Sequence, residues 1–290
     1  MNNMTIEKPA APTALAALLK NYSAEMTTHD RASLEAAGAL LPRGTEVFIA
    51  ALMKDDPDRH VAAATKIRQG GLEPVPHIVA RNIRARADLD SLLARLSGEA
   101  GVARALVLGG DRDKAAGEFE SSLQLIETGL FQKHGIKRIA IGCYPEGHPR
   151  IPDPVLDEAR AAKLRAAERA GLDVFLVSQF CFDAEPIIAL ARRMRAQGCN
   201  APFRVGVAGP ADRATLVKYA MICGVGASLR ALKERQSLAR NMLSGETPES
   251  VLTNVAEAQN AEPSLGIDSV HFFTFGSLAA SIKWVESRSR

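Results

Sequence analysis

The chain has 290 residues, of which 47% are hydrophobic and 24% are charged, and these values are typical of an ordinary globular protein and not of a disordered or membrane protein. Its 36 basic and 33 acidic residues are interleaved, which argues against a nucleic-acid groove. The longest apolar run near the start, residues 14–19, is too short for a signal-peptide core or a membrane span, and the four cysteines are widely spaced. We therefore expect a cytoplasmic protein with reduced thiols.

Short apolar and β-branched runs recur along the chain, and helical patterns follow them almost throughout. The predicted strands are residues 22–26, 46–51, 73–78, 105–108, 138–143, 174–179, 203–207 and 270–274. The main predicted helices are residues 57–69, 87–96, 119–133, 155–169 and 184–197. Alternation of this kind indicates a parallel sheet. Eight strands predict an α/β protein with a closed (β/α)8 barrel (TIM barrel), as a single domain over residues 17–290 after a flexible N-terminal tail over residues 1–16.

The alternative architecture is an open, doubly wound sheet. The first strand-to-helix junction, residues 25–30, lacks the G-x-G-x-x-G turn of a dinucleotide site, which favours the barrel. Before the last strand the connection is longer than the others, with predicted extra helices at residues 213–223, 228–243 and 248–260. Barrels often bind phosphate near that region.

Polar residues follow several of the predicted strands, where a barrel places its active site. They are Glu25, His77, Asp111, Tyr144, Glu146, His148, Gln179 and Asp183. Burial of Glu25 would raise its pKa toward the range of a general acid; the alternative is a carboxylate paired with Arg or Lys. Asp111 follows two glycines and is either a ligand contact or part of a surface turn. His77 is either a site residue or a core histidine with satisfied hydrogen bonds.

Other histidines carry less information. His29, His60 and His134 are expected at the surface, and His271 stands at the start of the last predicted strand. We find no metal-ligand spacing such as H-E-x-x-H, no nucleophile elbow and no P-loop, so no metal site is predicted. With these motifs excluded, acid–base chemistry and cofactor chemistry are the remaining kinds of reaction that the sequence predicts.

Several strand-end segments together resemble the bacterial methylenetetrahydrofolate reductases, a family of flavin-dependent barrels that make 5-methyltetrahydrofolate. The segments are Ser23-Ala24-Glu25, Gly71-Leu72-Glu73-Pro74-Val75-Pro76-His77, Leu108-Gly109-Gly110-Asp111, Tyr144-Pro145-Glu146-Gly147-His148-Pro149, Ser178-Gln179-Phe180-Cys181-Phe182-Asp183 and His271-Phe272-Phe273-Thr274. Their order and spacing are more specific than any one of them.

The resemblance implies an oxidoreductase of one-carbon metabolism and methionine biosynthesis that uses FAD and takes electrons from NADH or NADPH. Glu25 matches the general acid that protonates N10 of methylenetetrahydrofolate, and Asp111 matches the catalytic aspartate that faces the pterin and tunes the flavin. Gln179 matches a glutamine that binds the pterin. The positions that match contacts to FAD are His77, Tyr144, His148 and Asp157. The resemblance also implies a homo-oligomer.

The sequence departs from the family mainly on the flavin side. Gly109 replaces the usual arginine, residues 49–52 lack the usual threonine, Ala167 stands where a lysine is usual, with Lys163 out of register, and Gly276-Ser277 replace an Asn and Arg pair. Three hypotheses therefore stay open: NADH-dependent reduction of 5,10-methylenetetrahydrofolate through FAD, oxidative or flavin-independent turnover of 5-methyltetrahydrofolate in one-carbon catabolism, and a non-catalytic folate-binding barrel.

Overall fold

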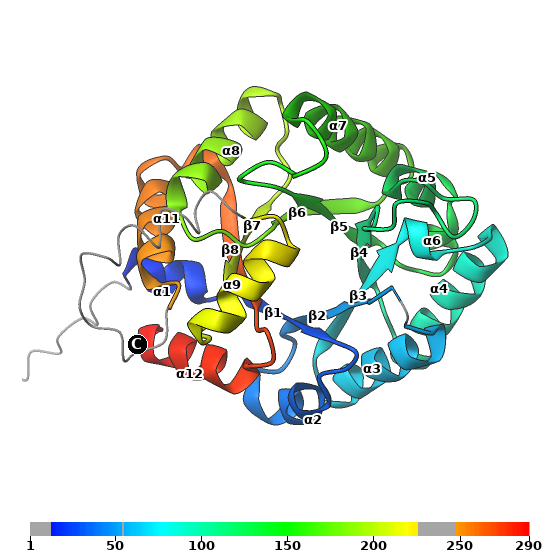
Figure 1. Cartoon of the computed structure of the whole chain (residues 1–290), viewed down its shortest axis with the longest axis horizontal. Coiled ribbons are helices and arrows are strands. Elements are labelled where there is room, and N and C mark those ends of the chain that lie inside the picture. The colour runs from blue at the N-terminus through cyan, green and yellow to red at the C-terminus, as the bar shows by residue number, and fades with distance from the viewer. Residues whose placement is uncertain (1–12, 54, 226–246, 290) are drawn as a thin grey trace, which may run out of the picture.

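The computed structural model describes residues 13–53, 55–225 and 247–289. Eight parallel strands close into a barrel in the order of the sequence, and helices surround it (Figure 1). The strands are β1 (Tyr22–Thr27), β2 (Glu46–Ala50), β3 (Glu73–Val79), β4 (Arg104–Leu108), β5 (Arg138–Cys143), β6 (Asp173–Ser178), β7 (Phe203–Ala208) and β8 (Ile267–Phe273). The predicted (β/α)8 barrel is confirmed, and each strand overlaps its predicted range.

The helices fill the connections between the strands. They are α1 (Ala14–Leu19), α2 (Arg31–Leu40), α3 (Pro57–Gln69), α4 (Arg86–Ala100), α5 (Ser122–Glu127), α6 (Leu130–Lys133), α7 (Asp153–Arg169), α8 (Ala184–Ala196), α9 (Arg213–Ile222), α11 (Glu249–Ala261) and α12 (Leu278–Arg288). Two 3-10 turns, η1 (Ala80–Asn82) and η2 (Pro263–Leu265), complete the described elements. None of the helices in the described ranges is long and apolar enough to cross a membrane.

Two of the predicted helices and the predicted N-terminal tail need comment. The single helix predicted at 119–133 is two helices, α5 and α6, because Gly129 between them adopts a left-handed conformation with φ of 73°. Helix α1 begins at Ala14, inside the stretch predicted as a flexible tail, and its Leu18 and Leu19 are buried. The helix predicted at 228–243 lies outside the described residues.

Helix α3 shows how the sequence defines these elements. The Asp56 side chain accepts a hydrogen bond of 2.7 Å from the Arg59 backbone N–H, and Pro57 occupies the first turn, where its missing N–H costs nothing. The helix buries one face that includes Val61 and His60. The prediction that His60 lies at the surface is wrong: its Nε2 donates to the Ile49 carbonyl at 3.2 Å, and burial lowers its pKa to about 4.

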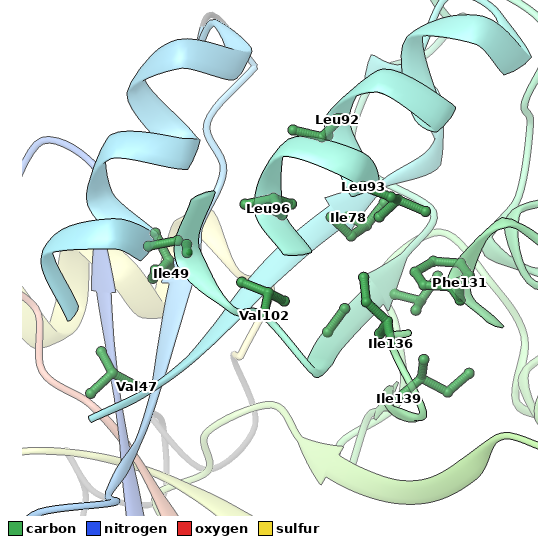
Figure 2. Packing of buried hydrophobic residues seen from close by; sticks show 14 of the residues in the cluster. Val47, Ile49, Ile78, Leu92, Leu93, Leu96, Val102, Phe131, Ile136 and Ile139 are labelled. Atoms are coloured by element: carbon green, nitrogen blue, oxygen red, sulfur yellow. The ribbon is translucent and has the colours of Figure 1, made fainter. Parts of the chain in front are cut away.

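Apolar side chains cover both faces of the strands. Outside the barrel, residues such as Ile78 of β3, Leu93 of α4 and Phe131 of α6 pack between strands and helices (Figure 2). Inside the barrel, Phe48 and Phe175 anchor a separate cluster that also contains Val75, Leu106, Ala140 and Val177. Because side chains fill the interior, polar groups that meet a ligand have to lie at the C-terminal ends of the strands.

Candidate active site

Glu25 of β1 lies between two buried histidines that come from distant strands. Its Oε2 is 3.3 Å from Nε2 of His271 on β8 and 3.1 Å from Nε2 of His77 on β3. The contact with His271 meets the geometry of a hydrogen bond, whereas the contact with His77 does not and is an electrostatic one. No group of three or more His, Cys, Asp or Glu in the described part of the chain is arranged to hold a metal ion.

The pairing of β1 with β8 creates this arrangement. Glu25 stands opposite Phe273 in the register, and Ser23 stands opposite His271. The Ser23 hydroxyl lies 2.9 Å from Nδ1 of His271, so the other ring nitrogen is directed at Glu25. Thr274 donates a hydrogen bond of 2.7 Å from its hydroxyl to the Glu25 carbonyl and joins the two strand ends.

The electrostatic environment of Glu25 differs from the expected one. Burial by itself raises the pKa of Glu25, but the charge of His77 and the hydrogen bond from His271 outweigh burial and lower the pKa to about 2. Burial also lowers the pKa of His271, against the opposing effect of Glu25. The expectation of a pKa raised toward that of a general acid is therefore wrong for the unliganded barrel, where Glu25 is a carboxylate paired with histidines instead of Arg or Lys.

A second group of predicted residues gathers at the ends of β4 and β5. Tyr144 lies near the exposed Asp111; burial, and to a lesser degree the Asp111 charge, raise the pKa of Tyr144 to about 12. The rings of Tyr144 and His148 meet edge to face at 5.0 Å. Burial and the Arg150 charge lower the pKa of His148. The structure thus brings Asp111, Tyr144 and His148 together beside the mouth.

The residues after β6 have mixed roles. Gln179 is partly exposed, and its side-chain oxygen accepts a hydrogen bond of 3.0 Å from the Phe180 N–H. Asp183 caps α8 by accepting from the Glu185 N–H at 3.2 Å, and Glu146 accepts from the Cys181 thiol at 3.2 Å. Asp183 and Glu146 therefore support the local fold, whereas Gln179 lies where a ligand can reach it.

Asp157 occupies a different environment from the other residues predicted to contact FAD. Its carboxylate lies 2.9 Å from Arg160, 3.6 Å from Arg193 and 2.8 Å from the side-chain nitrogen of Gln197, at the contact of α7 with α8. The structure brings Asp157 together with these partners and not with His77 or Tyr144. Tyr144 and His148 offer an aromatic ring and an imidazole just after β5, and the roles of His77, Tyr144, His148 and Asp157 in binding FAD stay predictions.

Two supporting residues, Ser23 and Thr274, and the imidazole of His271 were not among the predicted site residues. Strand alternation could have placed His271 on the same face as Phe273, two positions further along β8. The strand begins at Ile267, however, three residues before the predicted start, so His271 lies within it and not at its beginning.

Known proteins share both the sequence pattern and the barrel. A model of the family described as methylenetetrahydrofolate reductase matches residues 33–285. An uncharacterised protein from Clostridium thermocellum that binds two copies of 5-methyl-5,6,7,8-tetrahydrofolic acid superposes with a TM-score of 0.61 at 11% identity, covering 95% of this chain and 97% of that chain.

Two further solved structures resemble the barrel. Dihydropteroate synthase from Thermus thermophilus, in complex with 6HMPPP, has a TM-score of 0.50 at 15% identity and covers 94% of each chain. A putative phosphonomutase from Burkholderia cenocepacia has a TM-score of 0.52 at 13% identity and also covers 94% of each chain. At these identities the solved structures show a shared fold alone.

Proposed function

Because this chain belongs to the methylenetetrahydrofolate reductase family, we propose that it reduces 5,10-methylenetetrahydrofolate to 5-methyltetrahydrofolate, with FAD as cofactor and NADH or NADPH as electron donor. The observation that carries the proposal is the Glu25 carboxylate, held at the end of β1 by His77 and His271. The folate-bound neighbour from Clostridium thermocellum supports the substrate class.

Reduction requires one proton and one hydride at different atoms of the substrate. Glu25 gives its proton to N10 as the bond from N10 to the bridging carbon breaks, and the cation left between N5 and that carbon accepts the hydride as a methyl group. Asp111 and Gln179 contact the pterin and fix its position. FAD, which His77, Tyr144 and His148 would hold, would carry electrons from the nicotinamide donor to the substrate.

Glu25 has to obtain from another group the proton that it donates to N10. With its pKa lowered to about 2, Glu25 is a carboxylate at pH 7. His271 and His77 each place Nε2 within 3.3 Å of the carboxylate, a distance over which a proton can move between an imidazole and Glu25. A bound substrate that excludes water also raises the pKa of the acid. We therefore propose that His77 and His271 return a proton to the Glu25 carboxylate.

The lowered pKa of Glu25 also favours a second candidate, oxidation of 5-methyltetrahydrofolate. In that direction the methyl group loses a hydride to an acceptor, N10 attacks the carbon, and the Glu25 carboxylate removes the proton from N10. A resting carboxylate is already in the form that this base requires. Initial rates with NADH and methylenetetrahydrofolate, and with NAD⁺ and 5-methyltetrahydrofolate at the same pH, distinguish the two directions.

Replacement of Glu25 tests its part in either direction. We expect Glu25→Gln to lower folate turnover by about 10²- to 10⁴-fold, the usual contribution of a positioned acid or base, while NADH-to-quinone activity of the bound flavin persists. Product formation is measured by chromatography on the purified full chain. Glu35→Gln, at an exposed position on α2, is the matched control and should leave turnover unchanged.

The outcomes separate the parts of the proposal. Unchanged folate turnover in Glu25→Gln contradicts the role of Glu25. A visible absorbance spectrum without a flavin band, together with failure to bind added FAD, contradicts the flavin part and leaves the folate part to be judged by turnover. Tight binding of 5-methyltetrahydrofolate without turnover in either direction supports a non-catalytic barrel.

A further inference from the structure

Asp55, which follows β2, is a buried carboxylate outside the group around Glu25. Its side chain is 4% exposed, and it accepts hydrogen bonds from the Thr28 hydroxyl at 2.6 Å, the Leu52 backbone N–H at 2.9 Å and Nε2 of His29 at 2.6 Å. Burial by itself raises the pKa of Asp55, but these three hydrogen bonds outweigh burial and lower it. Asp55 is therefore an ionised group that joins the segment after β1 to the segment after β2.

Arg112, which follows Asp111, holds the segment after β2 from its other side. One of its terminal nitrogens donates to the Met53 carbonyl at 2.8 Å, and its Nε donates to the side-chain oxygen of Asn82, which follows β3, at 2.8 Å. Its own carbonyl accepts a hydrogen bond of 2.7 Å from Arg81. Arg112 is therefore fixed by hydrogen bonds to three residues, and it attaches Met53 to the segment that carries Asp111.

The residues Leu52, Met53 and Asp55, which we call the β2 loop, depend on these polar contacts for their position. Leu52 is 45% exposed and Met53 is 55% exposed, so apolar burial contributes little to holding them. Asp55 binds the Leu52 N–H and connects it to the β1 side, whereas Arg112 binds the Met53 carbonyl from the β4 side. Removal of either Asp55 or Arg112 therefore releases one side of the β2 loop.

The β2 loop connects the strand ends that carry Glu25 and Asp111. Strands β1 to β4 follow one another around the barrel, so β2 lies next to β1, and β3 separates β2 from β4 (Figure 1). Glu25 lies in β1 shortly before Thr28, which binds Asp55, and Asp111 directly precedes Arg112. Side-chain hydrogen bonds thus link the two site carboxylates beyond the last residues of the strands, where the sheet itself no longer joins them.

We propose that Asp55 and Arg112 are positioning residues that, through the β2 loop, fix the separation of Glu25 from Asp111. The inference rests on the proposed function and adds two residues to it. Glu25 protonates N10 and Asp111 contacts the pterin of the same substrate molecule, so the two carboxylates have to keep one spacing during the reaction. A displacement of about 1 Å at such a group can lower the rate about a hundredfold.

A double-mutant cycle on the full-length protein tests the proposal. Because Asp55 and Arg112 hold the same loop, we expect Asp55→Asn and Arg112→Ala each to lower kcat/KM for methylenetetrahydrofolate about tenfold, and the double variant to lose no more than the weaker single variant. Binding of 5-methyltetrahydrofolate should weaken about threefold in each, again without addition. Product formation is measured by chromatography, and dissociation constants are measured by titration calorimetry.

Three controls separate positioning from general damage. Arg112→Lys keeps a cationic donor for the Met53 carbonyl and should recover part of the lost kcat/KM. Asp58→Asn, at a side chain that is 84% exposed in the first turn of α3, should leave kcat/KM and the dissociation constant unchanged. NADH-to-quinone activity of the bound flavin does not use Glu25 and should be the same in every variant.

The outcomes distinguish this inference from the proposed function. Losses that multiply in the double variant, to about a hundredfold in kcat/KM, mean that Asp55 and Arg112 act independently and overturn the inference. Unchanged values in both single variants overturn it as well, and so does an equal loss of NADH-to-quinone activity. Wild-type protein that binds folate but never turns it over contradicts the proposed reaction, and the dissociation constants then decide the inference; wild-type protein that binds no folate contradicts both.

Discussion

Two adjacent glycines precede Asp111, and their backbones differ. Gly110 has φ of 102°, and a Cβ there would lie 2.5 Å from Cγ1 of Val79, whereas a Cβ on Gly109 would meet no atom within 4 Å. We expect Gly110→Ala to cost about 1–3 kcal/mol of unfolding free energy and to weaken folate binding by displacing Asp111. Gly109→Ala should change stability by less than about 0.5 kcal/mol. Urea unfolding of both variants measures the contrast, and equal losses would contradict it.

The local sequence around Glu25 could not predict the pKa of its carboxyl group, because that pKa depends on residues that are distant along the chain. A carboxyl group in a buried strand is expected to have a raised pKa, and only the identity of its spatial neighbours decides otherwise. Those neighbours are His77 and His271, and the latter is 246 positions away along the chain. The strand pattern predicted Glu25 and His77 as site residues, but it predicted neither His271 nor the contacts of both imidazoles with the Glu25 carboxylate.

Among the elements, strands were easier to predict than helix breaks. Each short apolar run became a strand because both of its faces are buried, outside by helices and inside by residues such as Phe48 and Phe175. The apolar pattern continues from Leu125 to Phe131, so it predicted one helix; the left-handed backbone of Gly129 ends that helix and starts another. The spacing of apolar residues predicts which residues are buried, but it does not predict where a turn interrupts a helix.

Strand β2 offers a test of stability, because its first residue, Glu46, contacts two other strands at the N-terminal end of the barrel. Glu46 accepts a hydrogen bond from Arg204 of β7 and lies 3.3 Å from Arg104 of β4. Arg204 is buried, and its guanidinium lies 4.7 Å from the centroid of the Phe175 ring. We expect Glu46→Ala to lower the unfolding free energy by about 3 kcal/mol, because a buried guanidinium loses its carboxylate.

The matched control for Glu46 is an exposed pair. Asp58→Ala removes a carboxylate 2.6 Å from Arg95 on the solvent side of α3 and α4, and it should leave the urea midpoint almost unchanged. Folate turnover of both variants should persist, because the active site lies at the opposite end of the strands. Loss of turnover in a folded Glu46→Ala protein would contradict this separation of stability from activity.

At the scale of the whole molecule, eight repeats of strand and helix predicted a parallel α/β fold, and the absence of a G-x-G-x-x-G turn after the first strand favoured the closed barrel over an open sheet. The site could be predicted only in outline. Asp111, Tyr144 and His148 come together at adjacent strands, as expected for residues at strand ends. Asp157, by contrast, pairs with Arg193 of α8, a contact that depends on how two outer helices pack and that no local pattern encodes.

The pairing of β1 with β8 closes the barrel, so unfolding at the closing strand reports on the whole chain. The single tryptophan, Trp284 of α12, is buried and lies 6.0 Å, centroid to centroid, from Phe272 of β8, so its fluorescence reports the closing strand. We expect fluorescence and circular dichroism to give the same unfolding midpoint, and 5-methyltetrahydrofolate at a hundred times its Kd to add about 2.7 kcal/mol, roughly 5 °C in Tm. Gln179→Ala, at the mouth, should reduce this shift at the same ligand concentration, because its Kd is higher. A shift that is equal in both proteins would place the ligand elsewhere than beside Gln179.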